Sequence, residues 1–172
     1  MTTDGGAEVL ACIGLGANLD DPVDQVTRAL AELDALDGVR VTRASSLYRT
    51  PPLGPGEQPD YVNAVAEAAC RLAPHDLLDA LQAIEKAHGR QRGPERWLPR
   101  TLDLDLLLYG DQHIEDARLT VPHREMARRA FVLVPLNELG GDREIPGQPP
   151  LAELLVAVNT DCIVRIPAAA AH

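Results

Sequence analysis

Two aspartates, Asp103 and Asp105, stand two residues apart in the run TLDLDLLLY at residues 101–109, which is otherwise apolar enough for a buried strand. Alternate residues of a strand share a face, so both carboxylates would project from one side, with their Cβ atoms ~7 Å apart. The leucines around them, Leu102, Leu104, Leu106 and Leu108, would face the core on the other side. Mg²⁺ commonly takes one or two carboxylates together with water and substrate phosphates, so the pair predicts a magnesium site.

Two clusters of arginines lie close to this segment in the sequence. They are Arg90, Arg92, Arg96 and Arg100 before or at its start, then Arg118, Arg124, Arg128 and Arg129 after it. A D-x-D pattern alone is weak, and the aspartates could instead pair with arginines in a structural network. We favour the metal interpretation, because a divalent ion and several guanidinium groups together describe a site for a polyphosphate.

The surrounding pattern predicts the elements that position these groups. Strands are expected at residues 8–17, 39–50, 61–70 and 101–109, and helices from Pro22, from Pro74 and within 149–158. Asp21 suits the N-cap of the first helix. The order β-α-β-β-α-β predicts an α+β sandwich, with a mainly antiparallel sheet and helices packed on its faces.

Composition limits the kind of protein that this can be. The chain has 172 residues and a net charge of −10, which argues against a general binder of nucleic acids or anionic membranes. Neither a signal peptide nor an apolar run of the ~20 residues that span a membrane is visible. Cys12, Cys70 and Cys162 are expected to be small core residues of a reduced protein. We expect one cytoplasmic, monomeric domain over residues 1–172, with flexible ends at 1–7 and 167–172.

The motif RWLPRTLDLDLLLYG resembles the signature of the 6-hydroxymethyl-7,8-dihydropterin pyrophosphokinases of folate biosynthesis. The similarity extends to GLGANLDDP, SSLYRTPPLGPGEQPDYVNAV, IEKAHGRQR and RLTVPHREM, in the family's order, over residues from about 9 to 147. It implies a ferredoxin-like α+β fold. It also implies transfer of pyrophosphate from ATP to the pterin hydroxymethyl group, with release of AMP and with two Mg²⁺ ions as cofactors.

The resemblance also implies roles for individual residues. Asp103 and Asp105 match the magnesium ligands, and Arg90 and Arg100 match arginines that assist catalysis. The matching positions for ATP are Gln82, Glu85, Arg92, Arg96, Trp97, Arg100, Leu106, Arg118, Thr120, His123 and Arg129. Those for the pterin are Thr50, Pro51, Leu53, Tyr61, Asn63, Trp97 and Phe131. The sequence departs from the family pattern at Gly93, where a basic residue is common, and at Arg124, where an aromatic residue is common.

The pterin positions agree with simple chemistry. Tyr61 and Asn63 share a strand face by alternation, so Asn63 could offer a donor and an acceptor to a heterocycle that stacks on Tyr61 and Phe131. Ordinary core packing is the alternative for both rings. By helical spacing alone, Gln82 and Glu85 would face solvent. The segment containing Gly14, Gly16 and Asn18 is interpreted as a turn before the first helix. The sequence identifies no compelling general base, and Asp105 is the one candidate.

Two other classes of function stay open at this point. A ferredoxin-like sheet can be a non-catalytic RNA-binding module, although such modules usually combine exposed aromatic residues with a basic surface. A D-x-D strand could also belong to another metal-dependent enzyme, such as a phosphodiesterase. Formation of AMP that depends on added pterin would separate the three possibilities.

Overall fold

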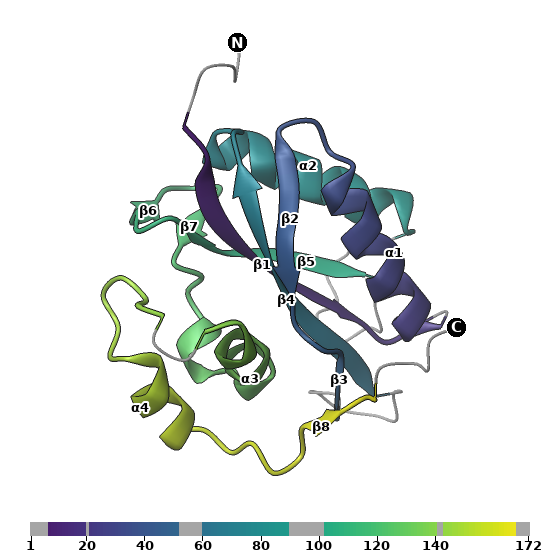
Figure 1. Ribbon diagram of the computed structural model, residues 1–172, viewed down its shortest axis with the longest axis vertical. Helices are drawn as coiled ribbons and strands as arrows, with labels where there is room; N and C mark the ends of the chain where they lie inside the picture. Colours follow the sequence, from purple (N-terminus) through teal and green to yellow (C-terminus); the bar gives the residue numbers. More distant parts are fainter. Residues whose placement is uncertain (1–6, 20, 52–59, 90–101, 141–142, 168–172) are drawn as a thin grey trace.

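The computed structural model describes residues 7–19, 21–51, 60–89, 102–140 and 143–167 (Figure 1). The strands are β1 (Val9–Ala17), β2 (Val39–Ala44), β3 (Tyr48–Thr50), β4 (Tyr61–Cys70), β5 (Asp103–Tyr109), β6 (Ile114–Glu115), β7 (Thr120–Val121) and β8 (Val164–Arg165). The helices are α1 (Pro22–Asp34), α2 (Pro74–Ala87), α3 (Ala130–Leu139) and α4 (Leu151–Val156), with the 3-10 turn η1 (Met126–Arg128) before α3.

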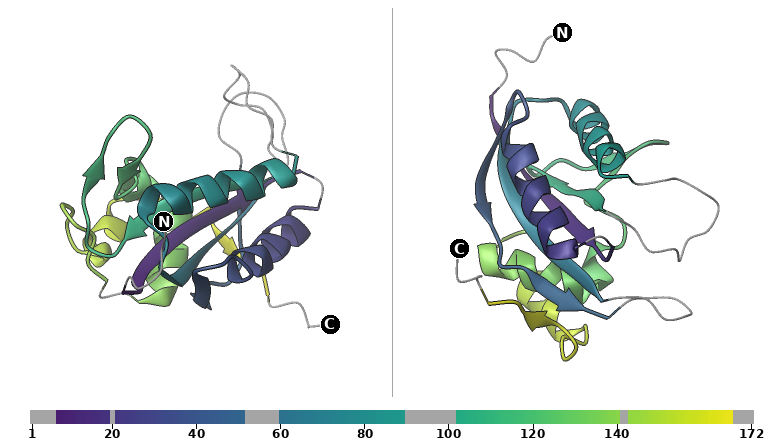
Figure 2. Two further views of the ribbon diagram at one scale, coloured as in Figure 1. Left: turned by 90° about the horizontal axis from the view of Figure 1, so that it is seen from above. Right: turned by 90° about the vertical axis from the view of Figure 1, so that its right-hand side faces the viewer.

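One antiparallel sheet organises the molecule. Its strands run in the order β5-β1-β4-β3-β8, and β2 also pairs with β4. Helices α1 and α2 cover one face, while α3 and α4 lie on the other (Figures 1 and 2). This arrangement confirms the predicted α+β sandwich and is compatible with the ferredoxin-like fold.

The two long helices begin where the sequence predicts. The Asp21 carboxylate accepts a hydrogen bond from the backbone N–H of Asp24 at 3.4 Å, and Pro22 occupies the first turn of α1. Helix α2 begins at Pro74, whose missing N–H is not needed there. The apolar stripes of both helices, which include the fully buried Leu33 and Leu77, pack on the sheet.

The strand expected at residues 39–50 is divided into β2 and β3, so that prediction is only partly correct. The break lies at Ser45. Its backbone N–H donates to the Val65 carbonyl at 2.9 Å, and its hydroxyl accepts from the Val65 N–H at 3.0 Å. The serine side chain thus replaces a backbone acceptor, and regular pairing stops.

Strand β5 contains a bulge that the alternating pattern does not reveal. Its pairing with β1 shifts register between Cys12 and Ile13, which leaves Leu107 as an extra residue. Leu107 and Leu108 therefore both join the core on the α3 side, and Tyr109 joins the core on the α1 and α2 side. The expectation that Leu108 shares a face with Leu102, Leu104 and Leu106 is wrong.

Burial corrects one further expectation. Cys12 and Cys70 are buried, as predicted, and burial raises the pKa of the Cys12 thiol to about 11, but Cys162 is exposed.

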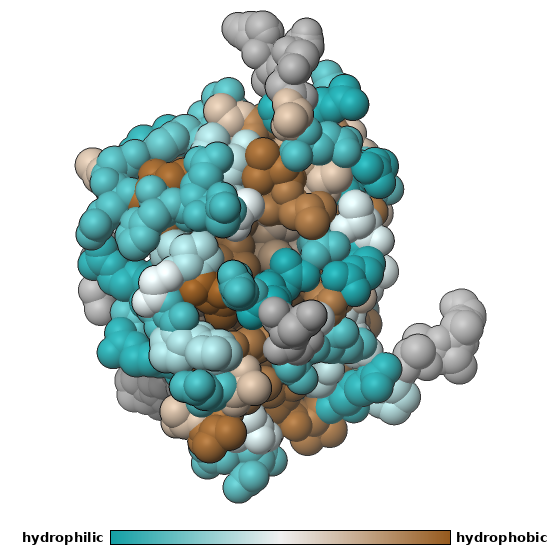
Figure 3. Space-filling model, turned by 60° about the vertical axis from the view of Figure 1, so that its left-hand side comes forward, coloured by the Kyte–Doolittle hydropathy of each residue, from teal (hydrophilic) through white to brown (hydrophobic). Residues whose placement is uncertain are grey.

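Among the described residues, the helices are all too short or too polar to cross a lipid bilayer. Hydrophilic residues cover most of the face drawn in Figure 3, with smaller hydrophobic areas between them.

A buried carboxylate, Glu67 of β4, ties two other segments to the centre of the sheet. Glu67 accepts hydrogen bonds from Thr42 at 3.0 Å, Arg43 at 3.3 Å and Arg143 at 2.6 Å. Burial raises the pKa of Glu67, but the hydrogen bonds outweigh it and lower the pKa from 4.5 to about 2. The ionised form therefore stabilises the fold.

We expect Glu67 to contribute to the acid sensitivity of the protein. A carboxyl group whose pKa is lower in the folded chain gives stability that is complete above the unfolded pKa and is lost as the pH falls toward the folded one. The free energy of unfolding should therefore fall between about pH 5 and pH 2, and fall less steeply in Glu67→Gln. Urea unfolding followed by circular dichroism at stepped pH measures both slopes. The exposed Glu153→Gln is the control, and equal slopes for Glu67→Gln and wild type would refute the assignment.

Candidate functional site

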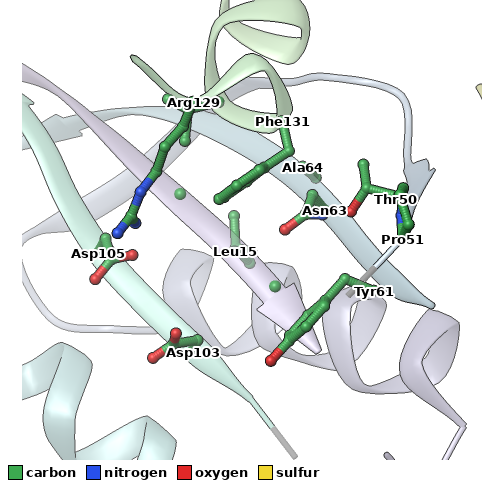
Figure 4. A pocket seen from close by; sticks show the side chains of 13 residues that line it. Leu15, Thr50, Pro51, Tyr61, Asn63, Ala64, Asp103, Asp105, Arg129 and Phe131 are labelled. Atoms are coloured by element: carbon green, nitrogen blue, oxygen red, sulfur yellow. Dashed lines mark hydrogen bonds between the residues drawn. The ribbon is translucent and has the colours of Figure 1, made fainter. Parts of the chain in front are cut away.

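A cavity of about 340 Å³ opens on the α3 side of the sheet (Figure 4). It is bounded by β1, β4 and β5 below and by the start of α3 above. Its lining residues are Gly14, Leu15, Gly16, Thr50, Pro51, Tyr61, Asn63, Ala64, Asp103, Asp105, Arg129, Phe131 and Val132. The cavity therefore brings together both aspartates, one of the arginines on the ATP side and five of the residues matched to the pterin.

Two glycines of β1 make the floor of the cavity hollow. In the strand register Gly16 lies between Asp103 of β5 and Asn63 of β4, and Gly14 lies beside Asp105. A Cβ atom on Gly16 would lie only 2.7 Å from Asn63 Oδ1. A side chain here would fill the space between the carboxylates and the amide, so the cavity depends on glycine at this position.

One end of the cavity combines an amide with two aromatic rings. Asn63 is 6% exposed, and its Nδ2 donates to Thr50 Oγ1 at 2.8 Å. That bond fixes the amide so that Oδ1 lies over Gly16, inside the cavity. The rings of Tyr61 and Phe131 also project into this end in Figure 4. A flat heterocycle that fits between the rings would meet a fixed hydrogen-bond acceptor at its edge.

We expect Gly16→Ala to weaken the use of a heterocyclic substrate selectively. The added methyl group would force the Asn63 amide away from its position, because a separation of 2.7 Å is too short for a carbon and an oxygen that are not bonded. The KM for the pterin should rise ~10-fold or more, with the KM for ATP changed less than ~2-fold. Steady-state kinetics with each substrate varied in turn makes the measurement. Unchanged pterin kinetics would show that the floor of the cavity does not hold this substrate.

The other end of the cavity is charged. Asp103 and Asp105 project from the same side of β5, and the Arg129 guanidinium points toward Asp105 (Figure 4). The same guanidinium lies 5.6 Å from the centroid of the Phe131 ring, a cation–π contact that joins the two ends. The charged end therefore offers both carboxylate oxygens and a positive group.

The aspartate pair fits a metal that takes its remaining ligands from substrate and water. Within the described ranges, His, Cys, Asp and Glu nowhere form a group of three or more that could hold a metal ion. A site made of protein groups alone is therefore not formed by these residues. Mg²⁺ is commonly bound by one or two carboxylates plus phosphate oxygens, so Asp103 and Asp105 match its usual donor set.

His123 lies beside the aspartates with a defined orientation. Its Nδ1 accepts a hydrogen bond from the Glu125 N–H at 3.1 Å, so the neutral ring carries its proton on Nε2. Nε2 lies 3.9 Å from Asp105 Oδ1. Burial lowers the pKa of His123, and the nearby Arg129 lowers it further. This histidine can therefore donate toward an anion near Asp105 while it remains uncharged.

The other described positions matched to ATP lie outside the lining of the cavity. The Arg118 guanidinium pairs with Asp79 at 2.6 Å, and the side chain of Leu106 is buried in the core. Thr120 belongs to β7 and Gln82 is half-buried on α2. Glu85 is 4% exposed and accepts a hydrogen bond from the Leu104 N–H at 2.7 Å, so the expectation that it faces solvent is wrong.

Several predicted site residues lie outside the described residues. They are Leu53, Arg90, Arg92, Arg96, Trp97 and Arg100. The two arginines matched to catalysis belong to this group, so their roles stay predictions. Gly93, one of the departures from the family pattern, also falls there.

Sequence reasoning missed five residues that line the cavity: Gly14, Leu15, Gly16, Ala64 and Val132. The interpretation of Gly14 and Gly16 as turn residues is wrong, because both belong to β1. Asn18, the third residue of that interpretation, lies beyond the strand. A glycine inside an apolar strand often marks a place where a ligand or another backbone approaches closely, and that signal was available here.

Comparison with known proteins identifies the family of this chain. Residues 12–141 match the family model for 7,8-dihydro-6-hydroxymethylpterin-pyrophosphokinase. A 2-amino-4-hydroxy-6-hydroxymethyldihydropteridine pyrophosphokinase of Pseudomonas aeruginosa is 49% identical over 157 residues, which cover 91% of this chain and 96% of that protein. The protein of the same description from Haemophilus influenzae is 48% identical over 147 residues, which cover 86% and 91% of the two chains.

Solved structures agree on the fold. A crystal structure of a Plasmodium falciparum HPPK-DHPS triple mutant matches 90% of this chain with a TM-score of 0.71 and 13% sequence identity. The match covers 45% of the longer Plasmodium chain. At such low identity the likeness shows the shared arrangement of strands and helices.

Proposed function

This chain belongs to the 7,8-dihydro-6-hydroxymethylpterin-pyrophosphokinase family, and we propose from this premise that its cavity binds the reacting parts of both substrates. The enzyme transfers pyrophosphate from ATP to 6-hydroxymethyl-7,8-dihydropterin, giving the pterin diphosphate and AMP in folate biosynthesis. The observation that best supports the proposal is that the aspartate pair and the amide–aromatic end line one cavity, separated by the glycine floor.

The pterin binds at the end formed by Tyr61, Phe131 and Asn63. Stacking on the two rings orients the heterocycle, and Asn63 Oδ1 accepts a hydrogen bond from its edge. The resemblance adds Thr50, Pro51, Leu53 and Trp97 to this subsite. Asp103 lies on the far side of Gly16 from Asn63 in the strand register, so a hydroxymethyl group that projects from the heterocycle across Gly16 reaches the charged end.

The triphosphate binds at the charged end. Asp103 and Asp105 would hold the two Mg²⁺ ions that the resemblance implies, and these ions would neutralise part of the charge on the phosphates. Arg129 and the Nε2–H of His123 contribute positive charge and a hydrogen bond beside them. The resemblance implies further positions for ATP, which are Gln82, Glu85, Arg92, Arg96, Trp97, Leu106, Arg118 and Thr120.

The chain performs the reaction mainly by positioning and electrostatics. The pterin hydroxyl oxygen forms a bond to the β-phosphorus of ATP as the bond from that phosphorus to the α–β bridging oxygen breaks. AMP leaves with the bridging oxygen, and the hydroxyl proton is released to water. Arg90 and Arg100 are the proposed stabilisers of the charge that develops on these oxygens. The protein contributes by holding the hydroxyl in line with the leaving oxygen.

Three broader expectations belong to the same proposal. Residues 1–172 form one domain, the domain works as a monomer, and it acts in the cytoplasm. The continuous sheet and its two hydrophobic cores support the first expectation within the described ranges. The two buried thiols, Cys12 and Cys70, are consistent with a reducing compartment.

One assay tests the proposed function against its alternatives. The protein is incubated with ATP, Mg²⁺ and 6-hydroxymethyl-7,8-dihydropterin, and the nucleotides are separated by chromatography. We expect AMP to form only when the pterin is present, and omission of Mg²⁺ to abolish it. Formation of ADP, or hydrolysis without pterin, would indicate a different enzyme. No turnover together with tight binding of single-stranded RNA would favour a binding module.

A further inference from the structure

Glu85 makes a contact that its resemblance to an ATP-binding position does not explain. β5 stands at the end of the strand order β5-β1-β4-β3-β8, so alternate N–H groups of its backbone point away from β1. The Leu104 N–H is one of these. It donates to Glu85 Oε2 of α2 at 2.7 Å, and Glu85 is 4% exposed. A side chain on a helix therefore supplies the acceptor that a further strand would otherwise provide.

The position of this hydrogen bond gives it a specific consequence. Leu104 is the residue between Asp103 and Asp105, and its own side chain is buried in the core. The Glu85 hydrogen bond restrains the peptide plane between Asp103 and Leu104, while pairing with β1 restrains the plane between Leu104 and Asp105. The directions in which the two flanking carboxylates project are set by those planes.

We propose that Glu85 is a positioning residue that fixes the backbone between the two aspartates and so holds their carboxylates in the geometry for divalent ions. The proposal rests on the proposed function for its metal, but not for the contact itself. It differs from the role that the resemblance implies, in which Glu85 touches the nucleotide. A carboxylate is a suitable acceptor here, because hydrogen bonds to charged groups are stronger than those between neutral groups.

Two substitutions separate the roles of the acceptor and of the charge. Glu85→Ala removes the acceptor, while Glu85→Gln keeps an amide oxygen in its place. Glu153→Ala makes the same change as the first at an exposed helical position on α4 and is the matched control.

The first measurement is amide hydrogen exchange at Leu104, followed by nuclear magnetic resonance without metal or nucleotide. We expect exchange to become ~10-fold faster or more in Glu85→Ala, to stay within ~3-fold of wild type in Glu85→Gln, and to be unchanged in Glu153→Ala. The Ile13 amide, in the neighbouring strand β1, is the internal reference. If exchange becomes faster at both Leu104 and Ile13, the variant has lost stability throughout the sheet. The test then rests on the exchange rate of Leu104 in Glu85→Gln. Unchanged exchange at Leu104 in Glu85→Ala overturns the proposal.

The second measurement is Mn²⁺ affinity in the presence of a non-hydrolysable ATP analogue. A positioning role predicts that affinity falls ~10-fold in Glu85→Ala and recovers to within ~3-fold of wild type in Glu85→Gln. The Kd for the pterin, measured without nucleotide, should change by less than ~2-fold in both. Equal losses of metal affinity in the two variants would show that the charge acts directly, against the proposal. If neither aspartate binds metal, the proposed function fails. The exchange result at Leu104, which is measured without metal, still tests the contact with Glu85.

Discussion

Replacing either aspartate of β5 with asparagine will lower kcat by about 1000-fold or more, which corresponds to ~4 kcal/mol of transition-state stabilisation. Asp103→Asn and Asp105→Asn keep the size of the side chain but remove one negative charge from the proposed metal site. Both side chains line the cavity on one side of the strand, so each change acts where the phosphates are expected. Turnover measured as AMP formed per second at saturating substrates gives the result directly.

A matched change shows whether the effect belongs to the site. Asp111→Asn makes the same substitution at an exposed position just beyond β5 and should leave kcat within ~2-fold of wild type. Thermal unfolding of all three variants verifies that the fold is intact. Near-normal turnover for Asp103→Asn or Asp105→Asn at saturating Mg²⁺ would remove that residue from the metal site.

Replacing the buried amide will have the second largest effect. Asn63→Leu keeps a similar volume but leaves the heterocycle without its acceptor and Thr50 Oγ1 without its donor. A site built to hydrogen-bond its substrate discriminates strongly when one partner is missing, so kcat/KM for the pterin should fall ~100-fold or more. The KM for ATP should change by less than ~3-fold, because the amide lies at the other end of the cavity.

Kinetics with the pterin and ATP varied separately make this second test. Asn137→Leu, at an exposed position on α3, is the control and should behave as wild type. An equal loss for both substrates would indicate a general disturbance of the sheet. A pterin kcat/KM within ~3-fold of wild type would exclude Asn63 from the pterin subsite.

The elements that rest on local signals could be predicted from the sequence. Asp21 and Pro22 mark the start of α1, and the apolar runs of β1 and β4 identify strands covered on both faces. The face of β5 that carries Asp103 and Asp105 also follows from alternation, because no bulge comes between them. In each case the deciding information lies within a few residues of the chain.

The features that depend on distant partners could not be predicted in this way. A run of three leucines gives no sign that Leu107 is an extra residue, since its register is set by pairing with β1. Ser45 ends β2 because of a contact with Val65, twenty residues away. Local spacing assigns Glu85 to solvent, whereas in the fold its carboxylate is buried and accepts a hydrogen bond from the Leu104 N–H at the edge of β5.

The same difference applies to the candidate site, part of which could be predicted and part of which could not. The resemblance placed Thr50, Tyr61, Asn63 and Phe131 at the pterin, and the fold brings all four to one cavity. The glycine floor was missed, because the space that Gly16 leaves open matters only beside Asn63 of the next strand. Residue types thus indicated the chemistry, whereas the shape of the cavity required the register of the sheet.

The binding of Mn²⁺ by electron paramagnetic resonance tests the metal site most directly. Protein with a non-hydrolysable ATP analogue is titrated with Mn²⁺, and the free ion is compared with a titration of the nucleotide alone. Wild type should bind two ions more tightly than the nucleotide does, and Asp103→Asn and Asp105→Asn should each weaken this binding by at least ~30-fold. If both variants bind Mn²⁺ as tightly as wild type, the two aspartates do not hold the metal.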